Sequence, residues 1–322
     1  MYLPDGSGFW EWPDGTPIIW GSYEDDMTYS LFDLTYKVAR ELGIVHEGTA
    51  TGGTTGTLID TYDLNQANDL WIDGSIWVLY DAGGAGAAPQ GQFAIASGST
   101  ASTSTVTFRS ALTAAVASGD RYAICRKIAD KAWLNVIIQK INTALQDLDR
   151  IPWTDVTSIT VAANQTEYSL PIAANMDLRE VWLQAINTDA NDNQWTEVRN
   201  WTVAKADPGN ADTLILPYQH TAGYALKLVY HARHPDLYVY SSPLSENVPI
   251  ERVINPAVRD CFMFRKANAG GANTWDDEIS IWTQRAEEVK STRPIRAVFK
   301  KGRIGDFSNN NTRYYPGDRT LT

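Results

Sequence analysis

The 322-residue sequence has little cysteine, no long apolar run and few positive charges. Its two cysteines, Cys125 and Cys261, are too few for a disulfide framework or a thiolate metal site, and we expect both to be reduced core residues. No apolar run approaches the roughly 18 residues of a membrane span, and residues 1–9 lack the basic start and apolar middle of a signal peptide. We therefore expect no membrane contact and no secretion by that route.

Positive charge is both scarce and unevenly placed. The 27 Lys and Arg residues against 38 Asp and Glu give a net charge of −11, which argues against a protein that wraps nucleic acid, because phosphate binding needs clustered cations. Residues 1–289 carry 19 − 36 = −17, whereas residues 290–322 carry 8 − 2 = +6. The sequence predicts an acidic body with a basic C-terminal arm.

Apolar and aromatic residues are plentiful. A hydrophobic content of 43 % with 20 % charged residues is typical of a folded chain. Twelve Trp and fifteen Tyr against eight Phe favour aromatic side chains with a polar tip, which serve interfaces as well as cores.

The first 26 residues combine six acidic side chains, no basic ones and six aromatics with several Gly and Pro. This mixture disfavours a regular helix or a central strand, yet the segment has too many aromatic residues for a disordered tail without a binding role. We interpret 1–26 as an extended arm that packs on another surface. Its predicted interface residues are Phe9, Trp10, Trp12 and Trp20.

Apolar residues recur at helical spacing in four segments, which predicts helices near 27–43, 133–148, 250–267 and 275–291. Pro256 either starts the third of these behind an Asn255 cap or kinks a longer helix.

Two long blocks between these helices are rich in β-branched and aromatic runs bounded by turn residues. The predicted strands are 75–80, 92–96, 104–108 and 121–125 in the first block, and 158–161, 166–170, 180–184, 213–217 and 225–230 in the second. Neither block is easily explained as a loop, because structureless loops of that length are uncommon.

The predicted fold class is therefore α+β: a four-helix bundle with two β-rich insertions and extended N- and C-terminal arms. The expected parts are the aromatic arm 1–26, a bundle formed by 27–47, 126–153 and 250–292, a β-insertion 48–125, a second β-insertion 154–249, and the basic arm 293–322.

Signatures of catalysis or cofactor binding are weak. The glycine run Gly83, Gly84, Gly86 and Gly91 lacks the Gly-Lys-Ser/Thr and the helix of a phosphate-binding loop. The loop residues Asp189, Asp192 and Asn193 lack the spacing of a calcium loop. We expect a solvated hairpin tip there, and no cofactor.

A candidate zinc site and a candidate glycosidase pair can each be explained as ordinary surface residues. His231 and His234 could begin a zinc site, but no further ligands lie nearby in sequence, so an exposed turn is favoured. Glu11 and Glu180, each beside tryptophan, could belong to a glycosidase pair, but both fit ordinary surface acids equally well. We expect no metal, no catalytic residues and no enzyme.

The C-terminal arm is the strongest local feature, because cations alternate with apolar and aromatic residues that are costly to leave in water. Such a segment can add a strand to the sheet of an acidic partner, although a disordered tail is the simpler alternative. The predicted binding residues are Arg296, Phe299, Lys300, Lys301, Arg303, Ile304, Phe307, Arg313, Tyr314, Tyr315 and Arg319.

Four segments resemble head-to-tail connector proteins of tailed bacteriophages, also called adaptor or neck proteins. They are Ile137 to Pro152 (IIQKINTALQDLDRIP), Asn164 to Gln184 (NQTEYSLPIAANMDLREVWLQ), Leu226 to Pro235 (LKLVYHARHP) and Arg252 to Ala257 (RVINPA). The resemblance covers 125–295 and, more loosely, 27–125; the aromatic arm and the first β-insertion depart from the simplest members.

This resemblance implies a structural virion protein, made in the host cytoplasm, that forms a ring of about twelve subunits under the capsid portal. Its implied partners are the portal protein, tail or neck proteins and further copies of itself, with the C-terminal arm reaching the portal. Genomic DNA would pass through the ring without sequence-specific binding, since an acidic lumen repels phosphates. The alternative is a glycan-binding β-module of a tail or surface fibre that stacks sugars on Trp and Tyr.

Overall fold

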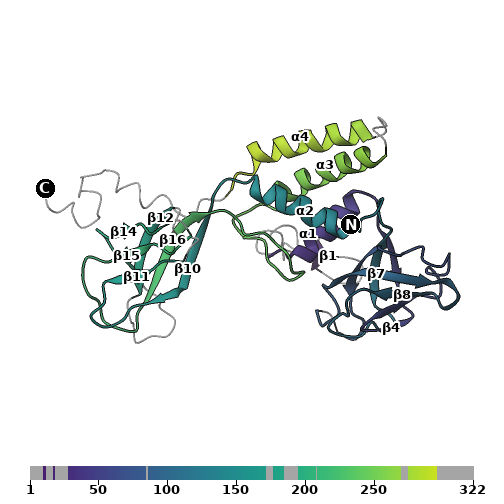
Figure 1. Cartoon of the computed structure of the whole chain (residues 1–322), viewed down its shortest axis with the longest axis horizontal. Coiled ribbons are helices and arrows are strands. Elements are labelled where there is room, and N and C mark those ends of the chain that lie inside the picture. Colours follow the sequence, from purple (N-terminus) through teal and green to yellow (C-terminus); the bar gives the residue numbers. More distant parts are fainter. Residues whose placement is uncertain are drawn as a thin grey trace. The chain divides into compact units, whose positions relative to one another are not determined.

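The computed structural model describes residues 10–11, 17–18, 28–84, 86–171, 177–184, 195–207, 209–269 and 275–295 (Figure 1). These residues contain four α-helices, three antiparallel sheets of three or more strands, and one pair of two-residue strands, β1 (Trp10–Glu11) and β2 (Pro17–Ile18). The chain divides into two compact units. The first unit comprises the described residues up to Leu134 together with Tyr238–Glu246, and the second comprises Asn135–Leu237 and the described residues from Asn247 onward.

The expected four-helix bundle core is wrong, because about 30 % of the structure is strand and the fold is mostly β-rich. Two large clusters of buried side chains, one in each unit, are formed by residues of the sheets and of the loops between their strands, with no helix residue among them. Sheets that bury their own apolar faces do not need a helical bundle as their support. Helical periodicity located the helices correctly, but it gave no information on which elements enclose the cores.

Helix α1 (Leu31–Glu41) begins at a capping box that the sequence S-x-x-D provides. The Ser30 hydroxyl accepts a hydrogen bond from the Asp33 amide at 3.3 Å, and the Asp33 carboxylate accepts one from the Ser30 amide at 2.8 Å. The helix ends at Glu41, Leu42 is its C-cap, and Gly43 follows with φ of +63°, a conformation that favours glycine. The helix predicted at 27–43 is thus confirmed with a later start.

Seven strands of the first unit form one antiparallel sheet in the order β3-β9-β6-β7-β8-β5-β4. Their bounds are β3 His46–Thr49, β4 Gly52–Thr54, β5 Thr57–Ile59, β6 Ser75–Tyr80, β7 Phe93–Thr100, β8 Thr105–Phe108 and β9 Arg121–Cys125. The two edge strands, β3 and β4, are separated only by Ala50 and Thr51, whose amides donate to Asp120 O and Ile59 O, each at 2.8 Å. The sheet therefore curls round and meets its own start, enclosing a core that includes Leu58, Val106 and Ile124.

Residues Tyr238–Glu246, which we call the strap, secure the start of α1. The amides of Leu31 and Phe32 have no partner within the helix and donate instead to Ser242 O at 2.8 Å and Tyr240 O at 2.9 Å. Leu244 N donates to Tyr29 O at 2.7 Å. The strap comes from 200 residues further along the chain, so no local sequence rule predicts this cap.

The second unit contains two smaller antiparallel sheets, ordered β10-β16-β12-β13 and β11-β15-β14. Their bounds are β10 Ile151–Thr160, β11 Glu167–Ser169, β12 Leu178–Gln184, β13 Trp195–Glu197, β14 Thr202–Ala204, β15 Thr213–Ile215 and β16 Ala225–Ala232. Alternate residues of each sheet, such as Val181, Leu214 and Leu228, share one core. The other face of the four-stranded sheet points away from that core.

Three helices accompany these sheets: α2 (Trp133–Gln146), α3 (Glu251–Asn268) and α4 (Asp276–Thr292). Pro256 lies inside α3, so the alternative in which it starts the helix is wrong. Oppositely charged pairs join α3 to α4 at both ends, Lys266 with Asp276 and Glu251 with Arg293. In addition, the Arg265 guanidinium lies 3.9 Å from the Trp275 ring centroid. These contacts fix the antiparallel alignment of the two helices.

A buried hydrogen bond joins α1 to the first-unit sheet, and its removal gives a testable prediction. Trp77 Nε1 donates to Thr35 Oγ1 at 3.0 Å, and both side chains are fully buried. Thr35→Val keeps the shape but leaves the indole N–H without an acceptor, so we expect a loss of about 1–3 kcal/mol in the free energy of unfolding.

Urea unfolding measures this loss. The control is Thr143→Val, which removes a hydroxyl that donates to Gln139 O on the exposed side of α2, and we expect it to change stability by less than about 0.5 kcal/mol. Equal effects of the two substitutions would contradict the prediction.

Candidate functional site

The two arms that the sequence singles out lie outside the detailed description. All predicted binding residues of the C-terminal arm, from Arg296 to Arg319, fall outside the described residues, as do Phe9, Trp12 and Trp20. Trp10 is described only through its backbone, which pairs with Ile18 between β1 and β2. Their binding roles therefore stay predictions.

The two histidines do not share an exposed turn. His231 is partly buried, with Nδ1 3.2 Å from Asp177 Oδ2, whereas His234 is only 3 % exposed and packs against Trp153 at a ring distance of 5.7 Å. The exposed-turn interpretation is therefore wrong for His234. Within the described ranges, no group of three His, Cys, Asp or Glu side chains is placed to hold a metal.

Burial perturbs the protonation of His234. Loss of water lowers the pKa of its imidazole below 6.5, and the Pro235 carbonyl, 2.7 Å from Nδ1, and the charge of Asp236 oppose this only in part. The ring is thus held neutral inside the second unit, where a proton would be unfavourable.

The acidic candidates have structural partners or lie outside the description. Glu180 is 5 % exposed, and its Oε2 accepts a hydrogen bond from Trp182 Nε1 at 2.9 Å. The side chain of Glu11 and the loop Asp189–Asn193 lie outside the described residues. Glu180 is therefore a buried acceptor that orients an indole ring, and the expectation of an ordinary surface acid is wrong.

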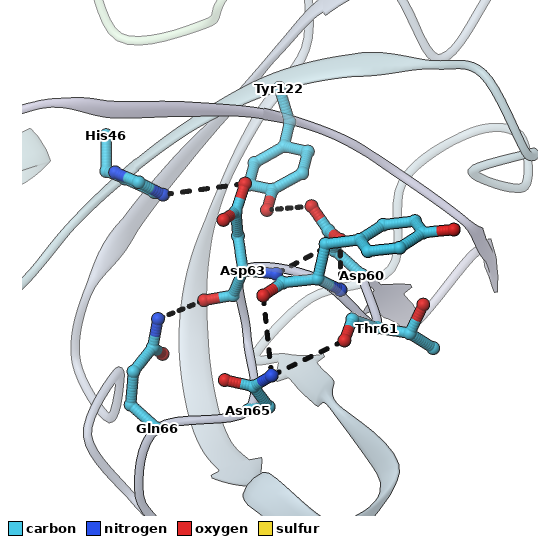
Figure 2. A network of polar contacts seen from close by, with 8 residues as sticks. His46, Asp60, Thr61, Asp63, Asn65, Gln66 and Tyr122 are labelled. Atoms are coloured by element: carbon cyan, nitrogen blue, oxygen red, sulfur yellow. Dashed lines mark hydrogen bonds and ion pairs between the residues drawn. The ribbon is translucent and has the colours of Figure 1, made fainter.

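A polar network lies at one end of the first-unit sheet, between β3, β9 and the turn that follows β5 (Figure 2). Its centre is the carboxylate of Asp60, which is 1 % exposed. Oδ2 accepts from the Tyr122 hydroxyl at 2.7 Å, and Oδ1 accepts from the amides of Tyr62 and Asp63 at 2.9 and 3.3 Å. At its edge, His46 Nε2 lies 3.8 Å from Asp63 Oδ2.

This network holds a turn through the buried carboxylate of Asp60. Burial and the bond to Asp60 raise the pKa of the Tyr122 hydroxyl far above its ordinary value, so it stays a donor. Gly48 lets the phenol approach, because a Cβ at that position would lie 2.5 Å from the Tyr122 oxygen. The turn that results displays Tyr62 with 80 % of its surface exposed.

A cluster of two tryptophans and one lysine occupies the outer face of the β10-β16-β12-β13 sheet, and we call it the Trp-Lys face (Trp182, Trp195, Lys227). Trp182 pairs directly with Lys227 across β12 and β16, and Gln184 pairs with Trp195 across β12 and β13. Lys227 Nζ lies 5.8 Å from the Trp182 ring centroid and 5.7 Å from that of Trp195. Both distances are within the range of cation–π attraction.

Sequence reasoning missed the Trp-Lys face. The alternation of Glu180, Trp182 and Gln184 along the predicted strand 180–184 is a signal that could have placed these three residues on one face. Lys227 and Trp195 join them only through strand register, which depends on the pairing of segments that lie far apart in sequence.

Comparison with known proteins finds one family that matches this sequence. A sequence model described as SU10 adaptor protein matches residues 117–297, which is more than half of the chain. No curated protein matches the sequence. Among the described helices, none is long and apolar enough to cross a membrane.

The Asp60 network predicts the outcome of Tyr122→Phe. The substitution leaves a buried carboxylate oxygen without its hydroxyl donor, and we expect a loss of about 1–3 kcal/mol in the free energy of unfolding, measured by urea denaturation. Tyr62→Phe is the matched control, because that ring is exposed, and we expect little change. Similar losses in both variants would show that the buried hydrogen bond does not stabilise the turn.

The burial of His234 predicts a pH dependence. Because its folded-state pKa lies below the unfolded value of 6.5, the unfolded chain takes up the proton first, and stability falls as the pH drops below 6.5 towards the folded pKa. We expect His234→Gln to flatten this fall, measured as unfolding free energy against pH. An unchanged slope in the His234 variant would refute the assignment.

Proposed function

The chain belongs to the SU10 adaptor protein family, and from this premise we propose that it forms a ring that joins the capsid portal to the phage tail and lines the DNA passage. The resemblance to phage head-to-tail proteins is confirmed at the level of a phage adaptor protein, a structural component of the virion. The ring, its number of subunits, the portal contact and the neck position are the proposal.

The observation that carries the proposal is the extent of the family match. Residues 117–297 take in β9, α2, both sheets of the second unit, α3 and α4. The range holds three of the four described helices and both sheets of the second unit. A match over such a range supports an adaptor role for the second unit as a whole, and not for a single motif.

The end of α4 supports a portal contact by the C-terminal arm. Lys290 pairs with Glu287 at 2.7 Å in the last turn, and Arg293, just beyond the helix, pairs with Glu251 of α3. The arm therefore starts from a position that is fixed on the second unit. Beyond Ile295 the sequence carries six cations and two acids, which suits an acidic partner surface.

The hydrogen bonding of two buried carboxylates agrees with a non-enzymatic role. Asp60 and Glu180 are engaged by donors from tyrosine, tryptophan and backbone groups, and such satisfied carboxylates stabilise a fold. The net charge of −11 per chain would make the wall of a ring acidic and repel DNA phosphates, which favours passage without adhesion.

Electron microscopy of the purified protein, alone and mixed with the portal protein of the same phage, tests the proposal. Rings, or portals with an additional tier, are the expected result. Monomers that ignore the portal would reject it, and binding to a glycan array would then test the alternative of a glycan-binding module.

Deletion of residues 296–322 tests the arm. This cut keeps Arg293 and its pair with Glu251, so we expect the body to fold with an unchanged unfolding midpoint but to lose at least tenfold in affinity for the portal. A control that keeps the arm's length replaces Lys300, Lys301 and Arg303 by Ser, which should weaken binding and reduce its salt dependence. Normal portal binding by the deletion variant would assign the arm another role.

A further inference from the structure

We propose that the strap detaches and reattaches as one cooperative segment, that its detachment releases the first turn of α1, and that Asn142 of α2 holds it in the attached state. The strap and α1 belong to the first unit, whereas Asn142 belongs to the second. The order of α1 would then depend on the state of the second unit. This conformational device does not depend on the proposed ring.

The first turn of α1 takes its hydrogen-bond acceptors from the strap. Leu31 and Phe32 are 0 and 7 % exposed, and the amide of each donates to a strap carbonyl. In the opposite direction, the carbonyl of Tyr29 accepts from the amide of Leu244 in the strap. Detachment of the strap would leave all of these backbone groups without partners. The strap and the first turn are therefore expected to gain and lose order together.

The strap is attached at a few points along its length. Its first two residues, Tyr238 and Val239, are 69 and 54 % exposed. The Tyr240 ring then meets the Phe93 ring edge-on at a centroid distance of 6.0 Å, and Leu244 is 3 % exposed. A segment with few buried apolar side chains opens at a lower free energy than the core of a sheet. The strap is thus suited to local opening without unfolding of the first unit.

Asn142 holds the residue from which the strap starts. Its side chain donates to Leu237 O at 2.9 Å and accepts from Leu237 N at 2.8 Å, and both residues are buried. The next residue, Tyr238, begins the strap, so the link from Asn142 to the strap runs along the chain itself. Loss of the two hydrogen bonds would leave the backbone groups of Leu237 unpaired and shift the population towards the detached strap.

The family match identifies the part of the chain to which this device belongs. The matched residues 117–297 include α2 and the strap, whereas α1 precedes them. The strap is therefore a segment of the matched region that is inserted into the first unit. Through it, the adaptor part of the chain can order or release a helix that lies outside the family match.

Native-state hydrogen exchange of the full-length protein, followed by mass spectrometry at low urea concentrations, tests the cooperative opening. We expect the amides of Leu31, Phe32 and Leu244 to open with one shared free energy and one urea dependence. Their protection should be at least tenfold lower than that of Ile124 in the central strand β9. Separate openings of the three amides, or exchange only together with Ile124, would overturn the proposal.

The variant Asn142→Leu tests the control by the second unit, because leucine has a similar volume and forms neither hydrogen bond to Leu237. We expect the protection of the Leu31 and Phe32 amides to fall at least tenfold, while that of Ile124 stays unchanged. If this variant does not fold, Asn142→Asp provides the same comparison, because it keeps an acceptor for Leu237 N and loses the donor to Leu237 O.

The matched control is Gln146→Leu, one turn further along α2. The Gln146 side chain donates to Asp236 at 3.1 Å on the exposed side, so it lies beside the start of the strap without holding Leu237. We expect this control to leave the protection of α1 unchanged. Unchanged protection of Leu31 and Phe32 in the Asn142 variant, or an equal loss in the control, would overturn the inference.

Discussion

Backbone amides at the ends of the sheets need acceptors, and this chain supplies them with buried acidic side chains. Asp120 is fully buried and accepts hydrogen bonds from the amides of Ala82 and Ala117 at 2.9 and 2.8 Å, tying two loops to the start of β9. Asp212 accepts from the Ala206 amide at 3.0 Å and from Lys205 Nζ at 2.6 Å just before β15. Without such acceptors the buried N–H groups would each cost free energy, and the loops would lose their fixed paths.

The same constraint explains the path of the strap. Asn142 of α2 donates from Nδ2 to Leu237 O at 2.9 Å and accepts from Leu237 N at 2.8 Å, so one side chain satisfies both backbone groups of the last residue before the strap. Ten residues after Leu237, Asn247 Nδ2 donates to Pro152 O at 2.9 Å. The chain is thus anchored in the second unit on both sides of the segment that caps α1.

The charged residues of this chain fall into two groups: buried carboxylates that hold turns, and the charged side chains of the two arms. Carboxylates such as Asp60 and Asp120 stabilise turns, and their negative charge is shielded by the donors around them. The charges of the N-terminal arm and the C-terminal arm are segregated by sign along the sequence. A protein that assembles with unlike partners at its two ends can use this segregation to give each partner its own surface.

Sequence alone determined the local elements. Period and composition predicted three of the helices and the strands at 75–80, 121–125 and 225–230 within about two residues, and the first helix with a start four residues too early, because side-chain alternation and capping residues act over a few positions. They did not predict β3 to β5, where Gly and Thr predominate over 48–57, because those strands gain their stability from the partners that they pair with.

Tertiary structure decided the rest. The bundle expected from four helical segments is wrong because sheets can enclose separate cores, a property of strand pairing between distant segments. Register likewise brought Lys227 between Trp182 and Trp195, and burial turned His234 from an expected surface residue into an interior one. The sequence by itself determined the helices, most of the strands and the charge of the two arms, because these depend on residues that are near one another in the chain. The tertiary structure decided which strands pair and which side chains meet, because these depend on contacts between residues far apart in the chain.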